Sequence, residues 1–303
     1  MSAAPGDGTF TLGPLTVRLL DDGPFRLDGG AMFGVVPKPL WARHKPADDR
    51  NRIAMVTNCV LVSRGDAHVL IDTGIGDKHD AKFCDLFGVD PDRRTLPQQL
   101  DAVGIAPEQI TDVVLTHLHF DHCGWNTRRD GDRVVPTFPR ARYWLQRGEV
   151  DHARAPNVRD RASYLPDNWE PLFEADQVAL FDDAAEVVPG VVVHRAPGHN
   201  ADMCIVTLNA VDDAAEGETG VIFADLVPTA AHVPPAWVMG YDLYPLTTVE
   251  HKTRWVARAA AGGWRCIFTH ETEAPVRRLV ESRPGRFVAQ PWRDAGTSEN
   301  HDG

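Results

Sequence analysis

Short apolar runs separated by polar turns dominate the first half of the chain. Residues 58–62 and 67–71 are apolar stretches joined by the polar residues 63–66, a pattern typical of a β-hairpin. Apolar positions with helical spacing follow at 96–103, and a short apolar run at 112–115 predicts a buried strand. We therefore expect this half to be rich in strands.

The second half repeats the pattern. Its predicted strands are 191–194, 204–208, 221–224 and 266–268. A helix is predicted at about 248–261, and an acidic turn at 212–218 separates two of the strands. Two strand-rich halves with intervening helices predict an α/β fold with two packed mixed sheets flanked by helices, an αββα sandwich. A doubly wound sheet of βαβ units is the alternative.

Length and composition are those of a globular protein. The chain has 303 residues, of which 43% are hydrophobic and 24% charged. Internal repeats and low-complexity linkers are absent from the sequence, so we expect a single domain over residues 1–293. Residues 294–303 are polar or small and are expected to form a disordered tail, and the first twelve residues are expected to fray.

The charge balance and the cysteine pattern indicate which binding partners and which cellular compartment are favoured. Forty-three acidic against 31 basic residues give a formal charge of −12, which disfavours nucleic acids and anionic membrane surfaces as partners. A secretory leader and a run of 18 apolar residues are both lacking. The five cysteines are scattered and form no C-x-x-C pair, as a reduced compartment favours. We predict a cytoplasmic protein without membrane association.

One stretch concentrates residues that bear chemistry. His117, His119, Asp121 and His122 fall within six residues, directly after the predicted strand 112–115. A loop beyond a strand end can direct several side chains to one point, and imidazole nitrogens with a carboxylate are ligands that zinc and similar ions prefer. Packing offers no reason for this spacing. The sequence therefore predicts a site for one or two metal ions.

The stretch His117-x-His119-x-Asp121-His122 resembles the H-x-H-x-D-H signature of the metallo-β-lactamase superfamily. Further positions match that family in order along residues 53–270: Asp72 in Asp-Thr-Gly, His199 in Ala-Pro-Gly-His, Asp225 in Phe-Ala-Asp and His270 in Phe-Thr-His. The resemblance implies a first metal bound by His117, His119 and His199. It implies a second bound by Asp121, His122 and His270, with Asp225 shared.

The resemblance also implies a chemistry. Two divalent ions, zinc being our choice over manganese, iron or cobalt, would activate a water for attack on a carbonyl or phosphoryl group. Asp121 would shuttle the proton as the catalytic residue. Asp72 is expected to support a ligand from behind rather than to bind metal, and Cys123 to pack beneath the loop.

A narrower resemblance suggests a substrate. Residues 27–41, 223–229 and 237–245 are similar to segments of the YtnP-like quorum-quenching lactonases, which open the ring of N-acyl-homoserine lactones. Segment 29–41 is expected to form a groove for an acyl chain. The alternatives are that it packs in the core or forms a homodimer contact. The groove residues proposed on this basis are Met32, Phe33, Val35, Trp41 and Trp237.

One departure from the better-known lactonases leaves the lactone itself open. Those enzymes carry a carbonyl-binding tyrosine three residues after the shared aspartate, and this chain has Pro228 there. His232, Tyr241 and Tyr244 are the proposed replacements. Residues 152–172 either cap the pocket or form a solvated loop. The rival functions are phosphotriester hydrolysis, carboxylic ester or thioester hydrolysis, and metal binding without catalysis.

Overall fold

The apolar runs form two seven-stranded sheets in the computed structural model of the chain, which describes residues 8–210 and 218–292. The first sheet has the order β1 (Thr9–Leu12), β2 (Leu15–Asp28), β3 (Arg52–Arg64), β4 (Ala67–Ile71), β5 (Asp112–Val114), β8 (Arg142–Gln146), β9 (Val178–Phe181). The second has the order β10 (Ala184–Val188), β11 (Val191–Arg195), β12 (Cys204–Leu208), β13 (Gly220–Ile222), β14 (Arg265–Ile267), β15 (Val276–Arg283), β16 (Arg286–Pro291). A separate hairpin joins β6 (Thr127–Asp130) and β7 (Arg133–Pro136).

Both sheets are mixed. In the first, β4, β5, β8 and β9 pair in parallel while β1 to β4 pair antiparallel. In the second, β13 and β14 are the parallel pair. Parallel strands end at the same edge of a sheet, so the loops after β13 and β14 can share one site. The predicted hairpin 58–62/67–71 is confirmed as β3–β4.

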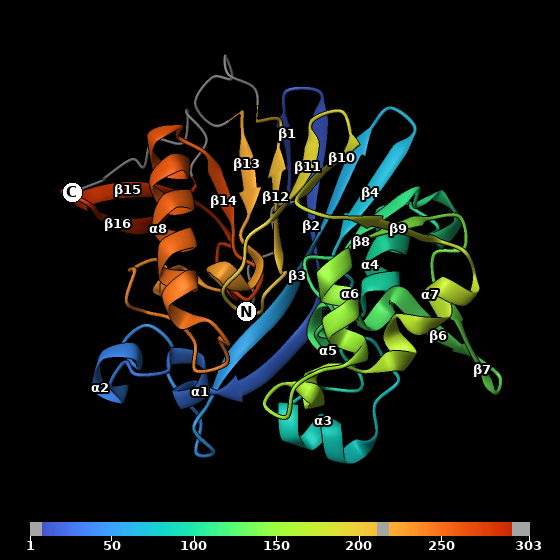
Figure 1. Cartoon of the computed structure of the whole chain (residues 1–303), viewed down its shortest axis with the longest axis horizontal. Helices are drawn as coiled ribbons and strands as arrows, with labels where there is room; N and C mark the ends of the chain where they lie inside the picture. The colour runs from blue at the N-terminus through green and yellow to red at the C-terminus, as the bar shows by residue number, and fades with distance from the viewer. Residues whose placement is uncertain (1–7, 211–217, 293–303) are drawn as a thin grey trace, which may run out of the picture.

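Helices cover the outer faces of the two sheets (Figure 1). The α-helices of the described residues are α1 (Gly29–Phe33), α2 (Lys38–Trp41), α3 (Ala81–Phe87), α4 (Leu96–Ala102), α5 (Phe120–Cys123), α6 (Arg147–Arg154), α7 (Glu170–Glu174) and α8 (Pro245–Ala261). Helix α8 lies over the second sheet, and α4 and α6 lie over the first. This is the expected αββα sandwich, and the doubly wound alternative is wrong. Within the described residues no helix is long and apolar enough to cross a membrane.

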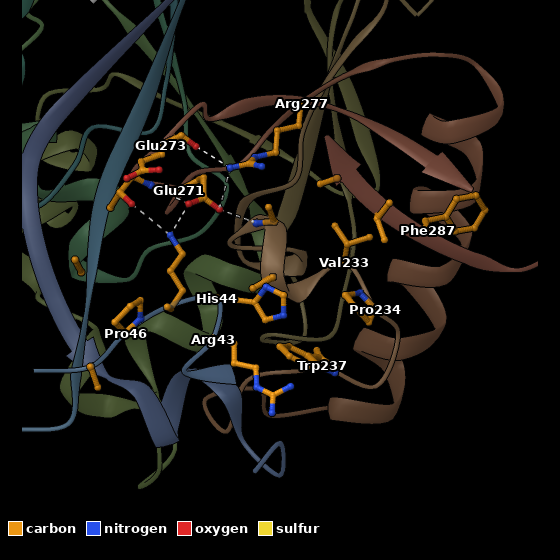
Figure 2. A pocket seen from close by; sticks show the side chains of 18 of the residues that line it. Arg43, His44, Pro46, Val233, Pro234, Trp237, Glu271, Glu273, Arg277 and Phe287 are labelled. Atoms are coloured by element: carbon orange, nitrogen blue, oxygen red, sulfur yellow. Dashed lines mark hydrogen bonds and ion pairs between the residues drawn. The ribbon is translucent and has the colours of Figure 1, made fainter. Parts of the chain in front are cut away.

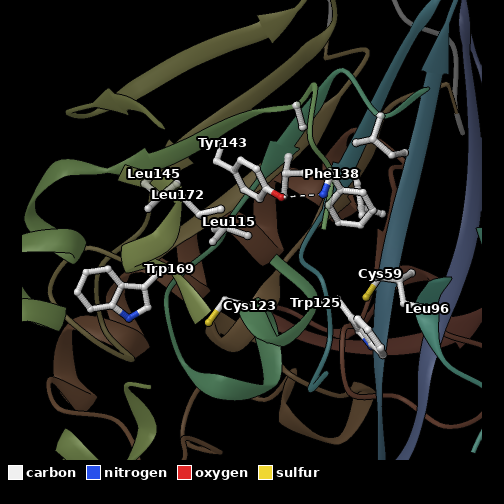
Figure 3. Packing of buried hydrophobic residues seen from close by; sticks show 14 of the residues in the cluster. Cys59, Leu96, Leu115, Cys123, Trp125, Phe138, Tyr143, Leu145, Trp169 and Leu172 are labelled. Carbon is white, nitrogen blue, oxygen red and sulfur yellow. Dashed lines mark hydrogen bonds between the residues drawn. The ribbon is translucent and has the colours of Figure 1, made fainter. Parts of the chain in front are cut away.

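Alternate side chains of the central strands pack into two different apolar clusters, one on each face of the sheet. Val60 and Val62 of β3 face the cluster between the sheets, whereas Cys59 and Leu61 face the cluster under the helices of the first sheet. Figure 3 shows part of that outer cluster, with Leu145 of β8 beside the helix residue Leu172. Strands buried on both faces appear in sequence as unbroken apolar runs, which is why these elements were predictable.

The N-terminal strands differ from expectation. Residues 9–12, expected to fray, form β1 and pair with residues 15–18. The following strand β2 was missed, because Asp21-Asp22-Gly23-Pro24 has the composition of a turn. The structure places a register shift between Asp21 and Pro24, with Gly23 at a φ of 81°. The chain therefore continues as one long strand through a bulge. The predicted tail 294–303 and most of the acidic turn 212–218 lie outside the described residues.

Candidate metal centre

The loop after β5 carries four of the predicted ligands into the interior. Strand β5 lies between β4 and β8, and the amide of Leu115 continues the ladder to the carbonyl of Trp144. The chain then turns through the single-turn helix α5. His117, His119, Asp121 and His122 are each at most 9% exposed. Polar side chains buried this deeply require partners, and they find them in one another and in the second sheet.

Three ligands from the second half meet this loop. His199 lies between β11 and β12, Asp225 follows β13, and His270 follows β14. The carboxylate of Asp225 stands between two sets of imidazoles. Its Oδ2 lies 3.4 Å from His199 Nε2 and 4.0 Å from His117 Nε2, and its Oδ1 lies 3.0 Å from His270 Nε2 and 3.5 Å from His122 Nε2. Asp225 therefore lies between the two groups of histidines, and its role as a shared ligand stays a prediction.

Ring nitrogens crowd together on each side of Asp225. His119 Nδ1 lies 3.1 Å from His117 Nε2 and 3.0 Å from His199 Nε2. On the other side, His122 Nε2 and His270 Nε2 are 3.3 Å apart, and Asp121 Oδ2 is within 3.8 Å of both. Each group offers ligand atoms that lie within 4.8 Å of one another. A cation among these lone pairs would resolve their mutual repulsion, so the donor set fits two divalent ions.

Partners behind three of the histidines fix which nitrogen faces inward. The Nδ1 of His122 lies 2.9 Å from Asp72 Oδ2, that of His199 lies 3.0 Å from Asp242 Oδ1, and that of His270 lies 2.9 Å from the Val56 carbonyl. Carboxylates and carbonyls only accept, so each Nδ1 carries a proton and each Nε2 is the nitrogen left to bind a cation. Metal-ligating histidines are held in this way. Asp72 contacts His122 from the side away from the other ligands, and its supporting role stays a prediction.

Burial and neighbouring charges shift the pKa values of several of these histidines. Burial and the neighbouring histidines lower the pKa of His117 well below its ordinary value, and burial does the same to the pKa of His119. Both rings are therefore neutral and available as ligands. Burial opposes protonation of His122, but Asp121, Asp225 and Asp72 raise its pKa well above its ordinary value. The carboxylates thus concentrate negative charge that a bound cation would neutralise.

A cavity of about 560 Å³ opens over this cluster. His119, Asp121, His199, Asp225 and His270 line one part of it. The remaining wall is mostly apolar and includes Leu27, Ala31, Met32, Met55, Phe87, Phe120 and Met239. Residues 159, 160, 162 and 163 also line it, so part of the segment 152–172 borders the pocket. A buried polar end and an apolar body are typical of small-molecule sites.

The proposed substrate residues separate into two groups. Met32 and Tyr241 line this cavity. The rings of Phe33, Trp41 and His232 instead form a buried stack behind it, with Phe33 centred 5.2 Å from Trp41 and 4.6 Å from His232. Burial lowers the pKa of His232 to about 3, so the ring is neutral.

Trp237, Tyr244 and Val35 are also absent from the described lining of the metal cavity. Trp237 lines a second cavity, Tyr244 is 47% exposed just before α8, and Val35 is 88% exposed. Pro228, in place of the tyrosine, accepts a hydrogen bond from the amide of His270 through its carbonyl at 2.9 Å. The thiol of Cys123 donates to the carbonyls of Leu118 and His119, beneath the loop.

Sequence reasoning missed two buried acids that support the site. Asp242 holds His199, and Glu149 Oε1 accepts from the amide of Leu118 at 2.8 Å and from the hydroxyl of Tyr164 at 3.1 Å. Burial raises the pKa of Glu149 to about 7. Glu149 lies on the polar helix α6, where an acid has the sequence signature of a solvated face. Asp242 lies in segment 237–245, where only Trp237, Tyr241 and Tyr244 were proposed as site residues from the sequence.

Comparison with known proteins agrees with this geometry. A model of the metallo-beta-lactamase superfamily matches residues 52–212, more than half of the chain. The N-acyl homoserine lactonase AiiB of Agrobacterium fabrum is 27% identical over 292 residues, which span 89% of this chain and 98% of that protein.

Two solved structures are similar in fold. A probable metal-dependent hydrolase from Staphylococcus aureus has a TM-score of 0.83 and 29% identity, covering 94% of this chain and all of that one. The dizinc quorum-quenching lactonase AidC has a TM-score of 0.75 and 19% identity, covering 95% and 97% of the two chains. The family match, the two sheets and the ligand geometry lead to one conclusion. The chain belongs to the metallo-β-lactamase superfamily and is a metal-dependent hydrolase.

Proposed function

We propose that this hydrolase opens the ring of N-acyl-homoserine lactones. The observation that carries the proposal is the metal cavity itself, because a cluster of ligands lines part of a cavity whose other walls are largely apolar. An acyl-homoserine lactone has the same division, with a compact polar ester ring and a flexible apolar chain. The similarity to a lactonase across nearly the whole chain supports the same substrate class.

In this proposal His117, His119 and His199 would hold one divalent ion, Asp121, His122 and His270 would hold a second, and Asp225 would be shared between the two groups. The ions, which we propose to be zinc, supply Lewis acidity and an activated water when bound. The protein residues orient the ester. Met32, Met55, Phe120 and Met239 pack against the acyl chain and exclude water from it.

Asp121 and Tyr241, which both line the cavity, are proposed to transfer a proton and to donate a hydrogen bond. Asp121 lines the cavity and lies beside His122 and His270, so its carboxylate can carry a proton to the leaving alcohol oxygen. Burial raises the pKa of Tyr241 to about 12, which keeps its hydroxyl protonated as a donor. Of the three proposed replacements for the missing tyrosine, Tyr241 is the one that lines the cavity. We therefore assign carbonyl recognition to it.

The test is direct turnover. Zinc-loaded protein is incubated with N-hexanoyl- and N-dodecanoyl-homoserine lactone, and proton release is followed in weak buffer. We expect metal-dependent ring opening that falls about 10²-fold or more in Asp121→Asn and about tenfold in Tyr241→Phe. Asp167→Asn is the matched control, because Asp167 is an exposed acid outside the described lining of the cavity.

Hydrolysis of a phosphotriester or a thioester without turnover of either lactone would overturn the lactonase assignment. It would leave the metal-dependent hydrolase in place, since the donor set suits those reactions equally.

A further inference from the structure

A second cavity lies on the opposite face of the β2–β3 strand pair from the metal site. Successive residues of a strand point to opposite faces. Leu27 of β2 and Met55 of β3 line the metal cavity, whereas their neighbours Arg26 and Ala54, which pair with each other, line the second. Among the described residues the two cavities share no lining residue. The second cavity is therefore a separate site and not an extension of the first.

Segments distant in sequence enclose this cavity (Figure 2). They are residues 43–48 before β3, residues 230–237, residues 271–273 after β14, and the β15–β16 hairpin. Its volume is about 860 Å³, within the range of small-molecule sites. Helices and strands of both halves thus leave a hollow large enough for an aromatic or branched organic molecule.

Positive charge gathers around the hollow. Its lining includes five basic side chains, Arg26, Arg43, Lys45, Arg277 and Arg286, against three acidic ones, Asp48, Glu271 and Glu273. This excess occurs in a chain whose formal charge is −12, so the local field differs in sign from that of the whole protein.

The acids of the lining are largely engaged by particular bases. Glu271 forms an ion pair with the buried Lys45, and Asp48 lies 3.0 Å from Arg52 outside the cavity and 3.9 Å from Arg26. Within the described parts of the chain, the guanidinium groups of Arg43 and Arg286 have no hydrogen bond or ion pair. These two exposed cations are therefore free to engage an anion.

The same lining also contains apolar side chains. Val233, Pro234, Trp237 and Phe287 are among them, and Figure 2 shows Phe287 and Trp237 at the margins of the cavity. Contacts at the edge of its ring hold Trp237 in place, with ring centres 5.8 Å from Phe33 and 5.4 Å from His44. Its backbone carbonyl accepts from Lys252 Nζ at 2.8 Å. A flat apolar body would have a fixed surface to pack against.

We propose that this cavity is a second ligand site, which binds a small organic carboxylate with an aromatic or branched apolar body. In this proposal Arg43 and Arg286, the lining guanidinium groups without a partner among the described residues, supply the positive charge that attracts the carboxylate. The apolar body packs on Trp237, Val233 and Phe287. A lining that combines cationic and apolar side chains favours an amphipathic anion over a neutral molecule and over an inorganic ion.

Binding to the full-length, metal-loaded protein tests the proposal. The probe is 2-naphthoate, compared with the uncharged 2-naphthalenemethanol, and both are titrated by calorimetry. We expect saturable binding of 2-naphthoate with a stoichiometry of one. The alcohol is expected to bind about tenfold more weakly or worse, because it lacks the charge-assisted hydrogen bonds.

Variants locate the probe. Arg43→Gln/Arg286→Gln is expected to weaken binding of 2-naphthoate about tenfold or more, and Arg133→Gln/Arg140→Gln is expected to leave it unchanged. The control pair removes the same charge from exposed positions outside this lining. Undiminished binding in the first variant places the probe elsewhere, including at the metals, and overturns the site. Equal affinity for acid and alcohol overturns the anionic ligand, and an absence of saturable binding overturns both.

Because these measurements follow binding and not turnover, they are independent of the lactone experiments. A protein that fails to hydrolyse lactones can still bind 2-naphthoate, and the reverse also holds.

Discussion

The two cavities lie back to back and are built in different ways. In the metal cavity, charged side chains come from strand ends, are almost fully buried, and in several cases have a partner behind them. In the second cavity, the free cations Arg43 and Arg286 are exposed and come from connecting segments and a hairpin. Strand ends fix side-chain direction, whereas exposed arginines are adaptable. The first arrangement suits bound ions and chemistry, and the second suits recognition alone.

Removal of the carboxylate at the centre of the metal site is expected to have the largest effect. Asp225→Ala is expected to lower turnover at least about 10³-fold, because both ion sites lose a ligand and the buried histidines repel one another. Bound metal measured by plasma mass spectrometry should fall in parallel. Full turnover with two ions retained would contradict the assignment of Asp225 as the shared ligand.

The buried stack of Phe33, Trp41 and His232 is expected to contribute to stability. Phe33 is fully buried in the stack with Trp41 and His232. Phe33→Ala is expected to lower the free energy of unfolding by about 3–5 kcal/mol, as large cavities in cores do. Val35→Ala, two residues away and 88% exposed, should change it by less than about 0.5 kcal/mol. Urea denaturation measures both, and similar losses in the two variants would argue against the stack as a structural layer.

A substitution at Asp72 tests whether the acids behind the histidines contribute to metal affinity. Asp72 accepts from His122 and from the amide and hydroxyl of Thr116. Asp72→Asn is expected to weaken metal affinity about 10–100-fold, measured by competition with a chelator. The exposed Asp66 on the β3–β4 turn gives the control, since Asp66→Asn removes the same charge without touching a ligand. Unchanged affinity in Asp72→Asn would show that His122 needs no partner.

A dependence of stability on pH is expected from Lys252, whose Nζ donates to the carbonyls of His232 and Trp237. Burial lowers the pKa of Lys252 from 10.5 to about 7. Between these values the unfolded chain holds a proton that the folded chain has released, so stability rises with pH across this window.

Lys252→Met removes that dependence. The difference in unfolding free energy between wild type and variant should rise with pH by up to about 1.4 kcal/mol per unit from roughly pH 7 to 10, measured by urea denaturation. A difference that stays flat or falls with pH would mean that Lys252 remains charged in the fold.

Local signals predicted the central strands and the positions of the metal cluster. Runs buried on both faces, such as those at 204–208 and 221–224, are apolar whatever the rest of the fold does. The spacing of His117, His119, Asp121 and His122 has no packing rationale, so chemistry was the better interpretation. By contrast, β2 was hidden because its bulge at Gly23 resembles a turn, and only pairing with β3 decides that the strand continues.

The aromatic residues mark the limit of sequence reasoning. Met32 and Phe33 are adjacent, yet the first lines the metal cavity and the second is buried in the stack behind it. Apolar character determines burial, but the side to which a residue points depends on a backbone set by contacts far away in the chain. The partners of Asp242 and Glu149 are invisible for the same reason, since they lie 43 and 31 residues distant.

Residue type and local spacing were enough to predict the family, the strand-rich halves and the side chains proposed to bind metal. The tertiary structure alone decided which apolar residues line the metal cavity, which acids hold the histidines, and that a second, cationic cavity exists on the other face of β2 and β3. Its lining joins Arg26 to Ala289 across 263 positions of the chain, and no local pattern records a surface assembled over such a distance.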